Sequence, residues 1–150
     1  MESTNKDLED NKLFKLHHIG FATLSVKDSL KNFSHLLFSK KIFLEYKDLE
    51  QKVNVQFFKL TKDIFIEFVV PLNLESPVNK FLEKNPMGGW HHMAYEVEDY
   101  EKEINSMKKS GFRRITNTSK GFEERKISFF LPIDNLQSPL IEIISKPNKA

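Results

Sequence analysis

The stretch HHIGFA at residues 17–22 decides the fold, because a similar stretch, HHMAYE at residues 91–96, opens the second half of the chain. Each stretch alternates along its length, as a strand does. A glutamate within an apolar run follows each one, 49 residues after His18 and 50 residues after His92. Self-similarity on this scale indicates that the chain consists of two related units.

The first half reads as one strand, one helix and three further strands. Ser25 and Asp28 form a capping-box pattern that opens the helix, whose apolar positions continue to Leu37. Branched and aromatic residues mark the later strands, and a polar turn at residues 61–63 separates the last two. The predicted strands cover residues 16–23, 42–46, 53–60 and 64–70.

The second half repeats this order after a connector rich in proline and glycine, which contains a short predicted helix at residues 76–84. A longer helix is predicted at residues 100–109, and Gly111 ends it. We therefore expect an α+β fold of two tandem βαβββ modules. The predicted strands of the second module cover residues 90–97, 112–117, 126–131 and 140–145.

These elements divide the chain into four segments. Residues 1–13 are polar and read as a disordered lead. The first module covers residues 14–72, and the second covers residues 89–146. A linker with the short helix joins them at residues 73–88, so that the two modules form one domain.

The composition excludes several classes of protein. The chain has 150 residues, no cysteine and a formal net charge of +2. Without cysteine there is no disulfide framework, zinc finger or thiol nucleophile, and His, Asp and Glu remain as metal ligands. The basic residues are scattered, and no apolar run approaches the roughly 20 residues that a membrane span requires. We expect a cytoplasmic protein that binds neither nucleic acid nor membrane.

Two glutamates within apolar strand sequences are the most unusual feature of the chain. Glu67 lies in the run FIEFV and Glu142 in the run LIEII. A buried carboxylate without a partner is costly, so a positive charge should meet these two. No lysine or arginine lies within three residues of Glu142, and Lys62 falls in the turn before Glu67. A divalent cation is the natural partner, because two carboxylates balance its charge.

Strand alternation selects one histidine of each pair as a metal ligand. His18 and His92 share their strand faces with small residues, which leave room for a metal ion and a substrate. His17 and His91 alternate with bulky residues, so we assign them structural or supporting roles. His35, in the first helix, reads as a surface residue. The predicted metal ligands are His18, Glu67, His92 and Glu142.

Two imidazoles and two carboxylates suit Zn²⁺, Co²⁺, Ni²⁺ or Mn²⁺, and the ligand types do not choose among these ions. An ion with water or substrate in its remaining positions acts as a Lewis acid. It binds a carbonyl oxygen and stabilises the enolate that forms when the adjacent proton leaves. This donor set therefore predicts a metal-dependent isomerase or lyase that acts on a small carbonyl compound.

Over about residues 15–145 the chain resembles the vicinal oxygen chelate superfamily of glyoxalases, bleomycin resistance proteins and dioxygenases. Within it the motifs are most similar to those of methylmalonyl-CoA epimerases, and they lie at residues 17–20, 50–51, 76–77, 80–84, 89–94 and 140–143. The resemblance implies a cupped mixed sheet around a metal ion held by His18, Glu67, His92 and Glu142. It also implies that Glu142 takes part in acid–base catalysis on a thioester substrate. We assign Glu67 a catalytic role beside it.

Two features depart from the epimerase pattern. Such enzymes carry a glycine-containing loop and a His-Pro-Lys segment before the last strand, whereas this chain has two acids in residues 121–125 and reads Leu-Pro-Ile-Asp at residues 131–134. Epimerisation by two bases also requires a second carboxylate in the pocket. Residues 53–58 offer only Gln56 and Asn54 as polar candidates there.

Alternative functions stay open at this point. A glyoxalase I-type lactoylglutathione lyase uses a similar metal site with a glutathione pocket. An extradiol dioxygenase is less favoured, because it holds iron with two histidines and one glutamate and a fourth protein ligand would block its substrate. A binding protein of the same superfamily would hold a small molecule without chemistry. We also expect a homodimer, since the exposed edges of the two modules allow one.

Overall fold

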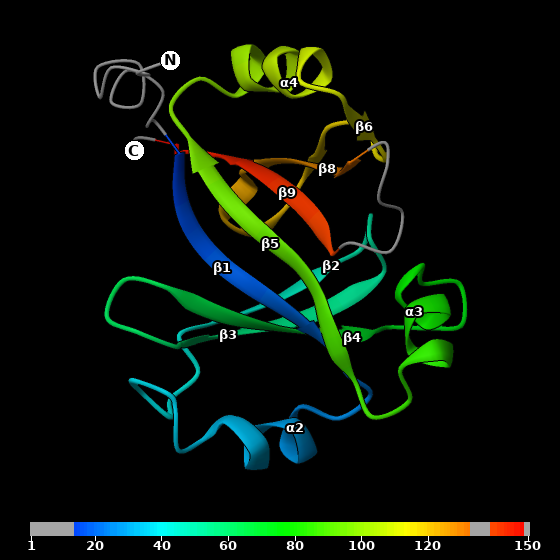
Figure 1. Ribbon diagram of the computed structural model, residues 1–150. Coiled ribbons are helices and arrows are strands. Elements are labelled where there is room, and N and C mark those ends of the chain that lie inside the picture. The colour runs from blue at the N-terminus through cyan, green and yellow to red at the C-terminus, as the bar shows by residue number, and fades with distance from the viewer. Residues whose placement is uncertain (1–13, 133–138, 149–150) are drawn as a thin grey trace, which may run out of the picture.

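The computed structural model describes residues 14–132 and 139–148, so the predicted lead at residues 1–13 lies outside the described residues. Within these residues there are three helices and nine strands, which follow the predicted order with β7 as an additional strand (Figure 1). The helices are α2 (Val26–Phe33), α3 (Val78–Lys84) and α4 (Tyr100–Lys109). The strands of the first half are β1 (Phe14–Ala22), β2 (Leu44–Asp48), β3 (Val53–Lys59) and β4 (Phe65–Pro71). Those of the second half are β5 (Gly89–Val97), β6 (Phe112–Arg114), β7 (Ser119–Lys120), β8 (Lys126–Pro132) and β9 (Leu140–Ser145).

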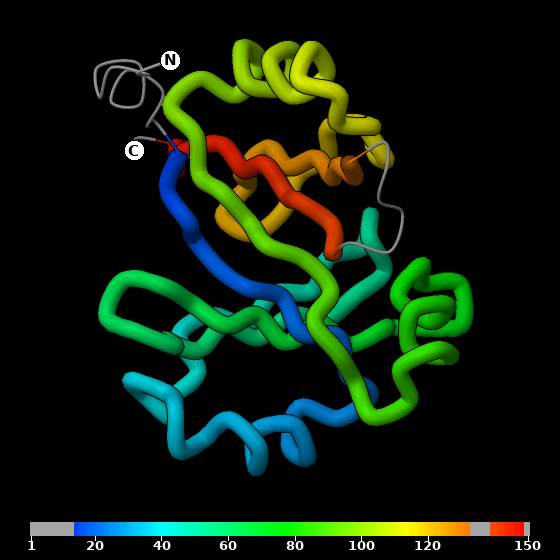
Figure 2. The backbone as a smooth tube through the Cα atoms, viewed as in Figure 1, coloured from blue at the N-terminus to red at the C-terminus, as the bar shows by residue number. Residues whose placement is uncertain are grey.

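The nine strands form one curved mixed sheet in the order β2-β3-β4-β1-β5-β9-β8-β6, with β7 paired to β8 (Figure 2). In each half the first strand pairs in parallel with the last, β1 with β4 and β5 with β9. The two first strands run antiparallel at the centre of the sheet and join the halves. The α+β fold of two βαβββ modules in a cupped sheet is therefore confirmed. The module limits, 14–72 and 89–146, remain our proposal.

The apolar core has three parts. One lies inside the cup, where β3 and β4 of the first half face β8 and β9 of the second. The other two lie on the outer face, where α2 packs on the first half and α4 on the second (Figure 1). On α4, Tyr100, Ile104 and Met107 are buried as the sequence predicts. Helices α2 and α4 thus support the sheet from outside, whereas Val78 and Leu82 of α3 belong to the inner part of the core.

Several boundaries differ from the sequence prediction. Helix α2 begins at the Ser25 cap, whose hydroxyl accepts the Asp28 amide, but it ends at Phe33. Beyond Phe33 the chain forms a turn, in which the Leu36 amide donates to the Phe33 carbonyl, and Leu36 is exposed.

No helix in the described part of the chain is long and apolar enough to cross a membrane.

The strand predicted at residues 112–117 is shorter and is followed by β7 and a single 3-10 turn, η1 (Phe122–Glu124). The last backbone bond of this stretch joins the Ile115 amide to the Phe129 carbonyl at 2.8 Å, and side chains make the contacts at Thr116. The Ser128 hydroxyl donates to the Thr116 carbonyl at 2.7 Å, and the Thr116 hydroxyl accepts the Phe129 amide at 3.0 Å. A periodic pattern does not show such side-chain bonds, so the sequence predicted a longer strand.

Candidate metal centre

The four predicted ligands lie on four adjacent strands at the centre of the sheet. His18 is on β1, Glu67 on β4, His92 on β5 and Glu142 on β9, and all four side chains are buried. The registers bring them to the inner face at two neighbouring levels, His18 with Glu142 and Glu67 with His92. The structure therefore brings together every residue that the repeat argument selected.

Small residues make the room for this cluster, as the sequence predicts. Gly20 lies in register between Glu67 and His92. Ala94 lies in register between His18 and Glu142. A Cβ atom at Gly20 would stand 2.1 Å from Cε1 of the His92 ring. The imidazole thus occupies the space that a larger residue would fill.

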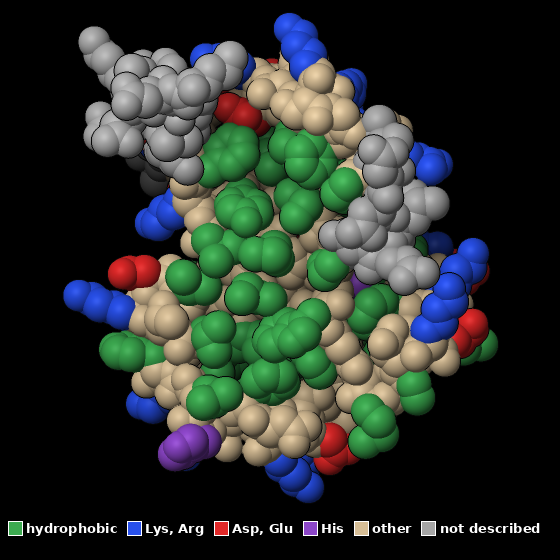
Figure 3. Space-filling model, in the orientation of Figure 1, with side chains coloured by type: hydrophobic (Ala, Val, Ile, Leu, Met, Phe, Trp, Pro, Cys, Tyr) green, Lys and Arg blue, Asp and Glu red, His purple; other side chains and the backbone are tan. Residues whose placement is uncertain are grey.

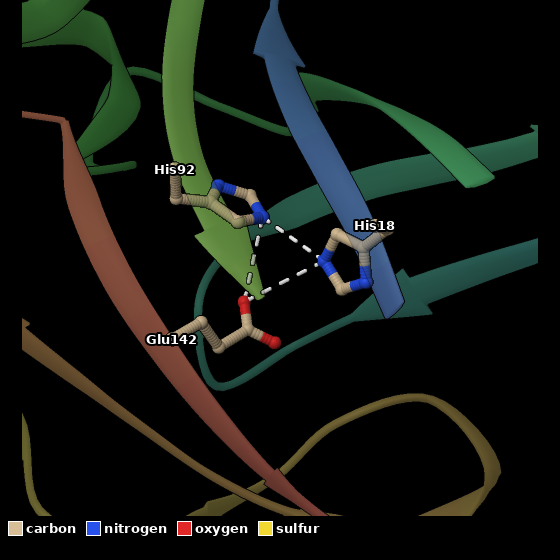
Figure 4. A group of neighbouring side chains, drawn as sticks. All are labelled: His18, His92 and Glu142. Carbon is tan, nitrogen blue, oxygen red and sulfur yellow. Dashed lines mark hydrogen bonds and ion pairs between the residues drawn. The ribbon is translucent and has the colours of Figure 1, made fainter. Parts of the chain in front are cut away.

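The donor atoms of the four side chains converge. The two Nε2 atoms of His18 and His92 are 3.1 Å apart. Nε2 of His92 lies 3.1 Å from Glu67 and 3.4 Å from Glu142, and Nε2 of His18 lies 3.5 Å and 3.8 Å from the same carboxylates. Figure 4 shows His18, His92 and Glu142 pointing toward one another, and one donor atom from each lies within 4.8 Å of the others.

These distances fit a bound metal ion. Two donor atoms about 2.1 Å from one ion lie about 3.0 Å apart at right angles and about 3.4 Å apart at tetrahedral angles. The observed separations of 3.1–3.8 Å between Nε2 atoms and their neighbours cover this range and exceed it by a few tenths of an ångström. A His18-His92-Glu142 group can therefore hold a metal ion, and Glu67 is in reach of both histidines.

The charges of the cluster also favour a cation. Burial raises the pKa of Glu142 to about 8, with the Glu67 charge adding to it against the opposing effect of His92. Burial lowers the pKa of His18 well below its usual value, and the charges of neighbouring histidines and Arg125 lower it further. Among the described residues, no lysine or arginine pairs with either glutamate. Burial lowers the pKa of His92, but the two glutamates outweigh it and raise that pKa above its usual value. A divalent ion would take the place of the proton on His92 as the positive partner of the carboxylates.

The predicted faces of His17 and His91 are wrong. Leu16 and His18 pair with consecutive residues of β5, which makes His17 an extra, bulged residue of β1. His91 is the extra residue of β5 in the same way. A bulge interrupts the alternation of a strand, so each histidine turns toward the inner side with the ligand that follows it.

Both of these histidines meet the adjacent ligand. Nδ1 of His17 lies 2.8 Å from Nδ1 of His18, and Nδ1 of His91 lies 2.8 Å from Nδ1 of His92. Burial lowers the pKa of His17 to about 4, helped by the charges of Arg125 and Lys15. It lowers the pKa of His91 to about 3, helped by His92. Both rings are therefore neutral near pH 7, in line with the supporting roles assigned from the sequence.

A cavity of about 160 Å³ lies beside the cluster on the inner face of the sheet. Glu67, Glu142 and His92 line it together with His91. Most of its wall is apolar, and the apolar lining includes Val53, Val55, Val69, Ile127, Phe129 and Leu140. A small apolar group with a polar end can enter this cavity and meet the donor atoms.

The sequence analysis missed Asp48. This residue ends β2, is buried, lines the cavity and accepts the backbone N–H of Gln51 at 2.9 Å. Burial raises its pKa. By contrast, Gln56 donates to Glu45 at 2.9 Å and is not part of the cavity wall. The alternation of Leu44, exposed Glu45 and Tyr46 along β2 is the signal that could have found Asp48.

The loop that departs from the epimerase pattern, residues 121–125, places Phe122 at the cavity wall and beside the rings of His17 and His18. Phe122 is buried and stacks on His17 with ring centres 5.2 Å apart. Arg125 lies over the Phe122 ring and binds Glu96 and Glu123 at 3.3 and 3.2 Å.

The other departure from the epimerase pattern, the segment at residues 131–134, lies partly outside the described residues. His35 is exposed, as predicted.

Comparison with known proteins extends these observations. A model of the Glyoxalase/Bleomycin resistance protein/Dioxygenase superfamily matches residues 17–129. The mitochondrial methylmalonyl-CoA epimerase of Dictyostelium discoideum is 29% identical over 132 residues, which cover 88% of this chain and 78% of the relative.

Solved structures share the fold. The hypothetical protein BH1468 from Bacillus halodurans C-125 superposes with a TM-score of 0.78 at 31% identity, over 93% of this chain and 99% of that one. A variant of Streptomyces coelicolor methylmalonyl-CoA epimerase in complex with 2-nitronate-propionyl-CoA gives a TM-score of 0.77 at 22% identity, over 91% and 100%. At that identity the likeness concerns the fold alone. With its duplicated βαβββ sheet and a family match over most of its length, the chain belongs to the Glyoxalase/Bleomycin resistance protein/Dioxygenase superfamily.

Proposed function

We propose that this protein is a metal-dependent epimerase that moves the α-proton of a CoA thioester of the methylmalonyl-CoA type. The observation that carries the proposal is the convergence of two buried histidines and two buried glutamates at the wall of an apolar cavity. The epimerase name of the relative from Dictyostelium supports the substrate class.

His18, His92, Glu67 and Glu142 are the proposed ligands, and the ion is one of Zn²⁺, Co²⁺, Ni²⁺ or Mn²⁺. When bound, it supplies Lewis-acid stabilisation of the charge that develops on a substrate carbonyl oxygen. Gly20 and Ala94 keep the space between the ligand side chains clear. The two carboxylates leave the filled site without net charge.

Glu142 and Asp48 are the proposed proton carriers. Burial raises the pKa of both carboxyl groups in the metal-free protein, which makes each a better proton acceptor than an exposed carboxylate. Glu142 reaches the cavity from β9, and Asp48 reaches it from the edge strand β2. Glu67 lies 3.1 Å from Nε2 of His92 and contributes a second carboxylate to the cluster. Two carriers on different walls allow a proton to leave one side of the α-carbon and return to the other.

Deuterium incorporation tests the proposal. Metal-loaded protein in D₂O should exchange the α-proton of methylmalonyl-CoA, and metal-stripped protein and Glu142→Gln should not. A glutathione hemithioacetal serves as the matched alternative substrate for the lyase reaction. Metal binding without exchange of the thioester would refute the epimerase assignment, and turnover of the hemithioacetal in its place would support the lyase.

We also propose that the protein is a homodimer. Hydrophobic side chains gather over β1 and β5 between α2 and α4 (Figure 3), and Phe14 and Trp90 on these strands are exposed. The sequence suggested pairing along the exposed edges, but the edge strands carry the exposed charges Glu45, Lys47 and Arg113, which oppose it. The apolar face is therefore the surface that a second copy would cover.

Sedimentation velocity tests the dimer. Trp90→Glu should shift the protein toward the monomer, because it places a charge in the apolar face. Leu74→Glu is the control, since Leu74 is 97% exposed and lies in the loop before α3. A wild-type monomer at all concentrations would contradict the proposal.

A further inference from the structure

We propose that His17 and His91 are positioning residues that each accept a hydrogen bond from the Nδ1–H of the following histidine, so that Nε2 of His18 and of His92 faces the metal ion. This inference rests on the metal centre proposed above. It concerns the protons on four imidazole rings, which can be measured without turnover.

The backbone builds the same arrangement twice. In a regular strand, neighbouring side chains point to opposite faces and their rings do not meet. The bulges at His17 and His91 remove this obstacle, and both place Nδ1 of the bulged histidine 2.8 Å from Nδ1 of the next one. The same contact occurs in two modules whose surrounding residues differ. This recurrence indicates that the contact has a role at each ligand histidine.

A 2.8 Å contact between two ring nitrogens requires one proton between them. The Nε2 atoms of His18 and His92 face each other and both glutamates, so these are the nitrogens available to a metal ion. A nitrogen that binds metal carries no proton, and a neutral ligand ring therefore carries its proton on Nδ1. Nδ1 of His17 and of His91 must then accept.

The rings that accept are held in place by aromatic neighbours. His17 lies between Phe65 and Phe122, with ring centres 5.2 Å away in both cases. His91 meets the Phe81 ring edge-on at 5.2 Å. Neutral acceptor rings must carry their own proton on Nε2. The structure thus assigns opposite tautomers to the two members of each pair.

Nitrogen-15 NMR tests the tautomers directly. In zinc-loaded protein labelled at histidine, long-range proton–nitrogen spectra should show protonated Nδ1 for His18 and His92 and protonated Nε2 for His17 and His91. A protonated Nδ1 on His17 or His91 would overturn the inference. Failure of the wild-type protein to bind zinc would instead refute the metal centre itself, so the two failures are distinguishable.

A matched pair of substitutions tests the effect on the metal ion. Asparagine and leucine have nearly the same shape, but only asparagine can accept the bond from the ligand ring. His91→Leu should weaken zinc binding by about 10–100-fold, the usual effect of losing a hydrogen bond behind a ligand. His91→Asn should bind zinc more tightly than His91→Leu. The same difference in zinc affinity is expected between His17→Asn and His17→Leu. Equal zinc affinity of the Leu and Asn variants, at equal stability of their metal-free forms, would overturn the inference.

Discussion

Replacing Gly20 by alanine should destroy the metal site while the fold survives. An alanine Cβ would stand 2.1 Å from Cε1 and 2.4 Å from both nitrogens of the His92 ring. Carbon atoms in contact are about 3.5 Å apart, so the ring must move by about 1.4 Å. Metal–ligand distances tolerate about 0.2 Å. His92 would therefore leave the ion, and we expect zinc affinity to fall by at least about 100-fold, since loss of a ligand exceeds loss of its supporting bond.

Gly89→Ala is the matched control, because its Cβ would stand 3.2 Å from the Phe81 ring, a contact that a small shift relieves. Both variants should retain the wild-type circular dichroism spectrum. Zinc affinity is measured by competition with a chromophoric chelator, and bound zinc by elemental analysis after dialysis. If folded Gly20→Ala bound zinc with wild-type affinity, His92 could not be a ligand whose ring occupies the space beside Gly20.

Three further predictions concern protons and metal. Asp48→Asn should keep its zinc but lose interconversion of the two epimers of methylmalonyl-CoA, measured by chiral analysis, and full interconversion would exclude Asp48 as a proton carrier. Because burial raises the pKa of Glu142 to about 8 in the metal-free protein and a ligand carboxylate must be ionised, zinc binding should release a proton below that pH. Protonation of Glu142 alone should then lower zinc affinity about tenfold between pH 7 and pH 6, and calorimetry should detect the released proton. In Glu142→Gln the dependence of log zinc affinity on pH should be less steep, by about one proton. Zinc at about 100 times its Kd should stabilise the protein by about 2.7 kcal/mol and raise Tm by about 5–10 °C, and an unchanged Tm would contradict binding to the folded state.

The duplicated fold could be predicted from the sequence because its signals are local. The Ser25 cap, the helix at residues 100–109 and the alternating strands each follow from short patterns, and the repeat of histidine and glutamate relates the halves. The same repeat selected His18, Glu67, His92 and Glu142, which the structure brings together. One buried glutamate or one strand histidine alone would not have indicated a metal site, but the same spacing in both halves did.

The errors come from features that depend on the three-dimensional pairing. A bulge adds one residue to a strand, so the alternation placed His17 and His91 on the wrong face. Asp48 could not be predicted as a cavity residue, because the curvature of the sheet, and not the pattern of β3, brings the end of β2 to the cavity. The side-chain bonds of Thr116 shorten β6, and they join residues 12 and 13 positions apart.

X-ray absorption of the zinc-loaded protein reports directly on the proposed ligands. We expect one zinc ion per chain with two imidazole and carboxylate oxygen ligands at about 2.0–2.2 Å, and loss of one imidazole signal in His92→Ala. Absence of bound metal after reconstitution with each of Zn²⁺, Co²⁺, Ni²⁺ and Mn²⁺, or a zinc shell without imidazole, would contradict it.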